Sequence, residues 1–129
     1  MGTQDFTTRK ILVVDDEPDM VTTCARILKR LGYDCLTAQN GPEAIRLIND
    51  QRPDLVVTDL HLPLGDGFEV SRHVRRCLPQ TPVIVVTAYH TPDTVGQAYA
   101  NGATGYLSKP FSNAEFSDAI RRALAASSR

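Results

Sequence analysis

The stretch Ile11-Leu12-Val13-Val14-Asp15-Asp16-Glu17-Pro18 runs from four apolar residues directly into three acids and a proline. A short apolar run without polar alternation is typical of a parallel strand that is covered on both faces. Asp15 and Asp16 stand where such a strand ends, and the carboxyl ends of the strands are where open α/β sheets bind ligands. The stretch therefore predicts both a central strand and the beginning of a functional site.

Four more strand candidates follow, and amphipathic stretches separate them. The runs at 55–57 and 83–86 also lack polar alternation and fit central strands, whereas the runs at 35–38 and 105–107 are mixed and fit edges. Helices are expected from Pro18 to Leu31, from Pro42, from about Asp66, from Pro92 with Thr91 as its cap, and from about Asn113. Strands that alternate with helices pair in parallel through right-handed crossovers. The sequence thus predicts an α/β fold, a five-stranded parallel sheet of order 2-1-3-4-5 in a doubly wound, flavodoxin-like (βα)5 sandwich.

Composition limits the classes of protein to consider. A chain of 129 residues that is 42% apolar suits one domain, and we expect residues 1–129 to form it, with a core at about 9–126. A formal net charge of −1 argues against direct binding of nucleic acid. Cys24, Cys35 and Cys77 do not form a metal or disulfide pattern, and no segment is long and apolar enough to span a membrane. We therefore expect a cytoplasmic protein.

Polar groups stand at the ends of four of the predicted strands. They are Asp15, Asp16, Asp59, Thr87 and Lys109. Each alone could be an ordinary cap, strand or surface residue. Together they predict one site, where two carboxylates about 4 Å apart would repel by roughly 4 kcal/mol at an effective dielectric near 20, so three acids need a cation. Mg²⁺ suits them because it takes carboxylate oxygens and can share phosphate oxygens, and Mn²⁺ could substitute for it.

These residues and their surroundings resemble the receiver domain of a two-component response regulator, of the chemotaxis-receiver kind. The matching segments are Ile11-Leu12-Val13-Val14-Asp15-Asp16-Glu17, Asp59-Leu60-His61-Leu62-Pro63 with Gly65-Asp66-Gly67, Val86-Thr87-Ala88, and Tyr106-Leu107-Ser108-Lys109-Pro110-Phe111. They span nearly the whole chain in the order of that family. The Asp pair or the Lys-Pro-Phe triplet alone would be weak, but the set is highly specific.

The resemblance implies a role for each site residue. Asp59 would take a phosphoryl group from a phosphohistidine to form an acyl phosphate. Asp16 and Asp59 would bind Mg²⁺ directly with the backbone carbonyl of His61, and Asp15 would act mainly through water. Lys109 would contact a phosphoryl oxygen, and its bond to Pro110 is expected to be cis.

The resemblance also implies a switch and its partners. Thr87 would move toward the phosphoryl group, with Ala88 leaving the approach open, and Tyr106 would follow Thr87 inward. The surface of the fourth helix, fifth strand and fifth helix would change as a result. The expected partners are a sensor histidine kinase or phosphotransfer protein, and an output domain or downstream protein; a homodimer on activation is a further hypothesis.

Two positions depart from the commonest pattern of the family. His61 and Tyr89 stand second after Asp59 and Thr87, and they are expected to tune hydrolysis of the acyl phosphate, so its lifetime stays open. The chain is expected not to be an enzyme beyond phosphorylating itself from phosphodonors and slowly losing the group. The alternatives are a receiver-like interaction module that needs no phosphorylation, and an aspartyl-phosphate phosphohydrolase, which would need an acid where His61 stands. The cognate kinase, the output, the oligomeric state and whether the chain is a truncated receiver stay open.

Overall fold

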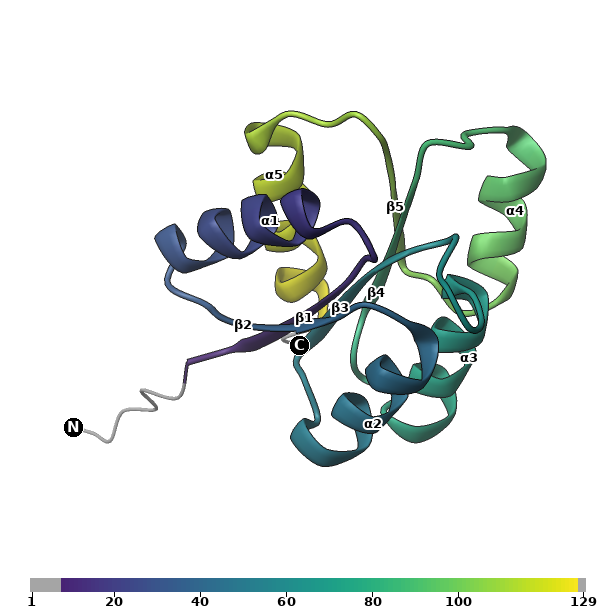
Figure 1. Cartoon of the computed structure of the whole chain (residues 1–129), viewed down its shortest axis with the longest axis horizontal. Coiled ribbons are helices and arrows are strands. Elements are labelled where there is room, and N and C mark those ends of the chain that lie inside the picture. The colour runs from purple at the N-terminus through teal and green to yellow at the C-terminus, as the bar shows by residue number, and fades with distance from the viewer. Residues whose placement is uncertain (1–7, 128–129) are drawn as a thin grey trace.

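One parallel sheet forms the centre of the computed structural model, which describes residues 8–127 (Figure 1). The strand order is β2-β1-β3-β4-β5, as predicted. The strands are β1 (Lys10–Val14), β2 (Asp34–Ala38), β3 (Leu55–Asp59), β4 (Val83–Thr87) and β5 (Gly105–Ser108). The mixed runs do form the two edges, and the uniformly apolar runs form the three strands between them.

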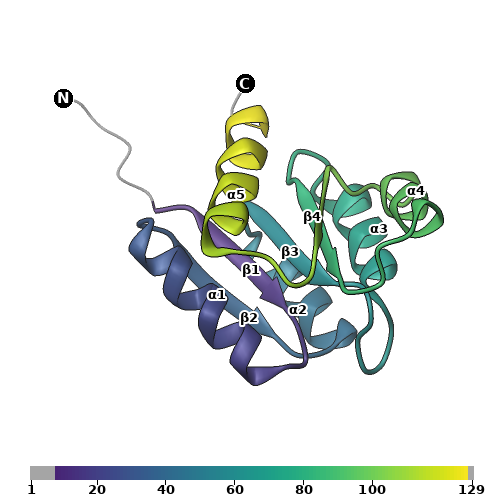
Figure 2. The same cartoon turned by 90° about the horizontal axis from the view of Figure 1, so that it is seen from above.

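Helices cover both faces of the sheet. They are α1 (Pro18–Arg30), α2 (Gly41–Gln51), α3 (Gly67–Cys77), α4 (Pro92–Ala100) and α5 (Asn113–Ser127). Helices α1 and α5 lie on one face, and α2, α3 and α4 lie on the other (Figures 1 and 2). The predicted α/β fold is therefore confirmed. Among residues 8–127, no helix is both long enough and apolar enough to cross a bilayer.

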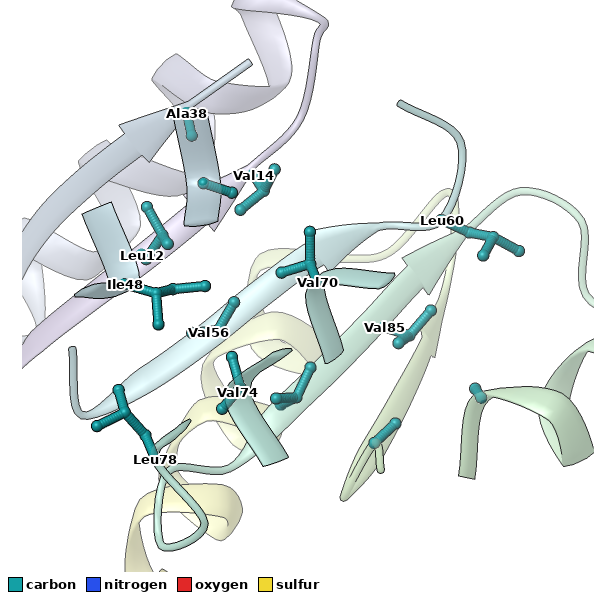
Figure 3. Packing of buried hydrophobic residues seen from close by; sticks show 14 residues of the cluster. Leu12, Val14, Ala38, Ile48, Val56, Leu60, Val70, Val74, Leu78 and Val85 are labelled. Carbon is teal, nitrogen blue, oxygen red and sulfur yellow. The ribbon is translucent and has the colours of Figure 1, made fainter. Parts of the chain in front are cut away.

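The core consists of two apolar layers, one on each side of the sheet. Because successive side chains of a strand point to opposite faces, Leu12 packs under α2 and α3 while Ile11 packs against α1 and α5. Figure 3 shows the first layer, in which Ile48 of α2 and Val74 of α3 lie close to Val56 of β3. Burial on both faces explains why the central runs carry no polar alternation.

Local signals set the ends of several helices. Asn40, Asp66 and Thr91 cap α2, α3 and α4, and each side chain accepts a hydrogen bond from a backbone amide of the first turn. The predicted cap at Thr91 is confirmed. Helix α1 ends one residue earlier than predicted, with Leu31 as its C-cap.

The strands and helices run in opposite directions through the molecule. All five strands end at one edge of the sheet, which we call the C-edge. Helix α5 starts near this edge and returns past the sheet, so β1 begins and α5 ends at the opposite edge (Figure 2). The C-edge is thus left to the loops that follow the strands.

Candidate functional site

The register of the sheet places the predicted site residues side by side at the C-edge. Val14 pairs with Thr58, and Asp59 pairs with Val86. Asp15 and Asp59 therefore lie side by side at the ends of neighbouring strands. The Lys109 amide donates to the Thr87 carbonyl over 3.0 Å, which places Lys109 just past the paired ends of β4 and β5.

Three carboxylates gather at this edge. One oxygen from each of Asp15, Asp16 and Asp59 lies within 4.8 Å of the other two. Asp15 is buried, Asp59 is partly buried and Asp16 is exposed. The pocket is therefore open on the Asp16 side and closed on the Asp15 side.

Lys109 bridges two of these acids. Its Nζ donates to Asp15 Oδ2 over 2.9 Å and to Asp59 Oδ2 over 3.0 Å. Burial lowers the pKa of Lys109, but its hydrogen bonds and charge interactions with Asp15 and Asp59 outweigh that effect and raise the pKa above its ordinary value. The ammonium is therefore charged at neutral pH. The Lys109–Pro110 peptide bond is cis.

The remaining oxygens of the two bridged acids are held by the backbone. Asp15 Oδ1 accepts from the Glu17 amide over 3.0 Å, and Asp59 Oδ1 accepts from the His61 amide over 3.3 Å. A Cβ at Gly67 would collide with the Asp59 carbonyl oxygen, so glycine lets α3 begin directly against the end of β3. The Asp59 side chain is thus fixed from both sides before any ligand arrives.

Thr87 lies on the same edge, but among residues 8–127 its hydroxyl has no hydrogen bond to the acids. Its buried hydroxyl accepts from the Tyr89 amide over 3.1 Å. Ala88 and Tyr89 are exposed, and the His61 ring meets the Tyr89 ring edge-on with centroids 4.6 Å apart. The Tyr106 hydroxyl donates to the Tyr89 carbonyl over 3.4 Å. Tyr89 therefore lies between the acidic pocket and β5.

The donor set suits a hard divalent cation. Lys109 supplies one positive charge against three carboxylates, which leaves a negative excess that one more cation would offset. All the donors are oxygens, as Mg²⁺ prefers, and the exposed position of Asp16 leaves room for the waters that Mg²⁺ keeps. The residues present therefore fit Mg²⁺.

The family model for the response regulator receiver domain matches residues 11–121, which is most of the chain. The chain belongs to this family. Receiver domains are signalling modules of two-component systems rather than conventional enzymes. The order of the matching segments and the acidic pocket agree with this assignment.

Individual relatives support the receiver assignment. The chain is 38% identical, over 90% of its length, to the alkaline phosphatase synthesis transcriptional regulatory protein PhoP of Bacillus subtilis, and it spans 48% of that protein. It is 33% identical to the beryllofluoride-activated NtrC4 receiver domain dimer, with a TM-score of 0.87 and coverage of 92% of this chain and 98% of that one. It is 30% identical to the receiver domain of sensor histidine kinase PA1611 from Pseudomonas aeruginosa, solved with a magnesium ion in its active site cleft, with a TM-score of 0.84 and coverage of 92% and 99%.

Some contacts around the receiver pocket were not apparent from the sequence. His90 had no evident partner, yet its ring lies 5.3 Å from the Tyr106 ring, measured between centroids. The Phe111 ring stacks on the Phe116 ring at 5.4 Å behind the acidic pocket. Only the aromatic character of these residues was visible in the sequence, since their pairing depends on how β5 and α5 pack.

Proposed function

We propose that this receiver domain is a phosphorylation-dependent switch in which Asp59 accepts the phosphoryl group. The observation that carries the proposal is the bridge from Lys109 to Asp15 and Asp59 at 2.9 and 3.0 Å inside the acidic pocket. It places a charged donor beside the nucleophile, where phosphoryl transfer needs positioning and charge stabilisation more than covalent assistance. The domain extends over the whole chain in this proposal, with its core at about 9–126.

The transfer would start from a phosphohistidine on a sensor histidine kinase or phosphotransfer protein. An Asp59 carboxylate oxygen attacks the phosphorus in line, a new P–O bond forms, and the P–N bond breaks with its electron pair going to the imidazole nitrogen. Lys109 exchanges its Asp59 contact for a phosphoryl oxygen while Asp15 holds its other hydrogen bond. The His61 amide keeps the second Asp59 oxygen in place.

Asp16 and Asp59, with the backbone carbonyl of His61, would hold Mg²⁺ directly, and Asp15 would act mainly through water. The magnesium ion in the cleft of the PA1611 receiver supports this choice of metal. When bound, Mg²⁺ supplies positive charge that offsets the phosphoryl oxygens. Mn²⁺ could replace it.

Thr87 and Tyr106 would transmit the change. The Thr87 hydroxyl, which now accepts from the Tyr89 amide, would turn toward the phosphoryl group, and Ala88 would leave that path open. Hydrogen bonds to charged groups contribute about 1.5–3 kcal/mol each, and a shift from 1:99 to 99:1 takes about 5.5 kcal/mol. New contacts from Thr87 and Lys109 are therefore about large enough, and Tyr106 would then lose its Tyr89 partner and turn inward.

His61 and Tyr89 would tune hydrolysis of the acyl phosphate. Their rings meet edge-on, the His61 amide donates to Asp59, and the side chain of Tyr89 is 64% exposed. Displacement of either ring would change how water reaches the phosphorus. The lifetime of the phosphorylated state therefore depends on this pair.

The output would come from the surface of α4, β5 and α5. A groove of about 520 Å³ lies on this surface, and its lining includes Tyr99, Tyr106 and Arg122. A downstream protein, an output domain or a second copy of the chain would bind there after phosphorylation. The dimeric NtrC4 receiver supports the last of these. Light scattering with and without beryllofluoride tests dimerisation, and an unchanged mass would contradict it.

Intact mass after incubation with acetyl phosphate tests the central proposal. The wild type should gain one phosphoryl group in the presence of Mg²⁺, and Asp59→Asn should gain none. Omitting the metal should also abolish the gain. An unmodified wild type that also fails to bind beryllofluoride would refute the proposal.

A further inference from the structure

Helix α4 is attached to the rest of the molecule mainly at one end. It has one buried residue, Ala98, in its last turn. Gly96 lies in open space, since a Cβ there would meet nothing within 4 Å. Few buried apolar contacts are typical of segments that open at low free-energy cost. The one fully buried side chain of this helix therefore lies near its C-terminal end, whereas Val95 in its first half is half-buried.

Polar contacts from α3 reinforce that end. The hydroxyl of Ser71, which is fully buried, donates to the Asn101 carbonyl over 2.9 Å. Arg72 Nη1 donates to Asn101 Oδ1 over 2.7 Å. Arg75 Nη1 donates to the Ala100 carbonyl over 3.4 Å, and the Arg75 side chain lies so close to Gly102 that a Cβ there would meet it at 2.9 Å. Ser71 and Arg75 thus satisfy backbone carbonyls that the helix leaves unpaired at its C-terminus, whereas Arg72 holds the Asn101 side chain.

The chain then continues from this end into the sheet. The Asn101 side chain donates back to the Gln97 carbonyl over 2.7 Å, and the Ala103 amide donates to the Ala98 carbonyl over 3.0 Å. The Thr104 amide donates to the Val83 carbonyl over 2.8 Å. The turn after α4 is therefore tied both to the helix and to β4.

At the N-terminal end, aromatic packing takes the place of such polar contacts, since the ring of His90, two residues before Pro92, lies 5.3 Å from the Tyr106 ring, measured between centroids. Residues 88–91 are all exposed. The Thr91 hydroxyl caps its own helix by accepting from the Thr94 amide, which does not tie the helix to the sheet. The contact from Tyr106 to the Tyr89 carbonyl, at 3.4 Å, is the long bond that activation would break.

We propose that Ser71 and Arg72 are positioning residues that make the C-terminal end of α4 a fixed hinge at Asn101. The N-terminal end, which follows directly from Thr87 and Tyr89, is then the end that moves. Hinges are commonly a few residues at the end of an element. The difference between the two ends of α4 is a property of the unphosphorylated protein. The phosphorylation that would drive the motion rests on the function proposed above.

Because the C-terminal end is fixed, a small change at Thr87 would rotate α4 about that end rather than loosen the packing of the whole helix. Because α3 holds Asn101, displacement of Tyr89 would be largest around Pro92 and would fade toward Ala100. The part of the output surface nearest the acidic pocket would therefore change first. Release of the Asn101 contacts would instead let the whole helix shift.

Hydrogen exchange of backbone amides tests the hinge in the free protein. The Asn101 and Ala103 amides should have higher protection factors than the Val95 amide. Arg72→Ala and Ser71→Ala should each lower protection at Asn101 and Ala103 by about tenfold, because each removes one anchoring hydrogen bond. The matched control is Arg76→Ala, an exposed arginine of the same helix whose guanidinium contacts His73, and it should leave both amides unchanged.

Beryllofluoride provides the second arm of the test. In the wild type, exchange should change at Val95 to Gln97 and stay constant at Asn101 and Ala103, whereas in Arg72→Ala the change should reach both ends. If Arg72 had a structural role alone, Arg72→Ala would lower the protection factors without changing which amides respond to beryllofluoride. Equal protection at the two ends of wild-type α4, or an equal response of both, would overturn the hinge. A complete lack of response would count against the proposed function alone, since the free protein still decides the hinge.

Discussion

Leu64 has a backbone conformation that its side chain disfavours. Its φ is +56°, in the left-handed region, and the side chain is 73% exposed in the loop between β3 and α3. A left-handed conformation costs a residue with a Cβ roughly 1–2 kcal/mol. Because the Leu64 side chain is largely exposed, its burial does not offset this cost, and the left-handed residue destabilises the loop beside Asp59.

We expect Leu64→Gly to raise the free energy of unfolding by about 0.5–1 kcal/mol, because relief of the backbone strain exceeds the added entropy of the unfolded chain. Urea denaturation measures the change. Leu64→Ala is the control, since it removes the exposed side chain but keeps the Cβ, and it should leave stability nearly unchanged. A less stable glycine variant would show that the Leu64 side chain makes a stabilising contact.

The three cysteines should differ in reactivity. Burial and the nearby Asp15 carboxylate raise the pKa of Cys24 to about 12, and burial raises the pKa of Cys35 to about 11, whereas Cys77 is exposed. The thiolate is the reactive form, and at pH 8 it is scarce for a thiol whose pKa is far above 8. A disulfide reagent at pH 8 should therefore modify one thiol rapidly in the folded protein and all three in denaturant. In Cys77→Ser the rapid phase should vanish, and its survival would contradict the assignment.

At the scale of elements, the helices on the two faces of the sheet differ in how many residues they bury. Helices α1 and α5 each bury several residues against one face, while α4 buries only Ala98 on the other. Gly96 weakens α4 further, because glycine costs roughly 1 kcal/mol relative to alanine inside a helix. The helix with one buried residue is thus part of the surface proposed for output.

Gly96→Ala should raise the free energy of unfolding by about 0.5–1 kcal/mol, because the added methyl group meets nothing within 4 Å and the helix gains propensity. Thermal or urea unfolding gives the measurement. The contrasting variant is Gly41→Ala, whose Cβ would lie 2.7 Å from the Leu64 carbonyl oxygen and should destabilise the protein. Stabilisation by both variants would mean that propensity outweighs this close contact.

The sequence predicted elements where one local signal was strong. The unbroken run up to Val14 indicated a covered strand, and the Thr91-Pro92 pair indicated a helix start. Contacts between helices were not predictable in this way. His73 Nε2 and Asn49 Oδ1 are 2.8 Å apart although the residues are 24 positions apart, and Arg72 reaches Asn101 over 29 positions. Such pairs depend on how the helices pack together, which no local pattern encodes.

The site shows the same division. The strand ends placed Asp15, Asp59 and Lys109 at one edge, because parallel strands share their direction. The direction of the Thr87 hydroxyl was not predictable, since its bond to the Tyr89 amide depends on the turn after β4. The strand order was enough to predict that the site residues come together. The hydrogen bonds of each side chain depend on the loops, which the sequence did not predict.

At the scale of the whole molecule, function and stability compete at the C-edge. The chain has a net charge of −1, yet three acids and one lysine meet at this edge. We expect repulsion among the acids, which one lysine offsets only in part, to destabilise the metal-free fold. A cation that binds only the folded state would stabilise it by mass action.

Asp16→Asn should raise stability in EDTA, because it removes one like charge from the cluster without removing a partner of Lys109. It should also abolish the stabilisation by Mg²⁺, which in the wild type should reach about 2.7 kcal/mol at a hundredfold excess over Kd. Thermal unfolding with EDTA and with Mg²⁺ measures both effects. Asp50→Asn, at an exposed acid near the end of α2, serves as the control and should keep the full Mg²⁺ effect. Undiminished stabilisation of Asp16→Asn by Mg²⁺ would exclude Asp16 as a ligand.

The return of α5 past the sheet has a practical consequence for handling the protein. Because β1 begins and α5 ends at the edge opposite the acidic pocket, a carrier or a sensor chip attached at either point stands away from Asp59 by about the length of a strand, roughly 17 Å for five residues. Immobilisation through these points would leave the pocket facing the solution. Surface-based binding assays with small phosphodonor mimics can therefore use a tethered sample, whereas a tether after α5 would lie beside the groove of the proposed output surface, whose lining includes Ala126 and Ser127.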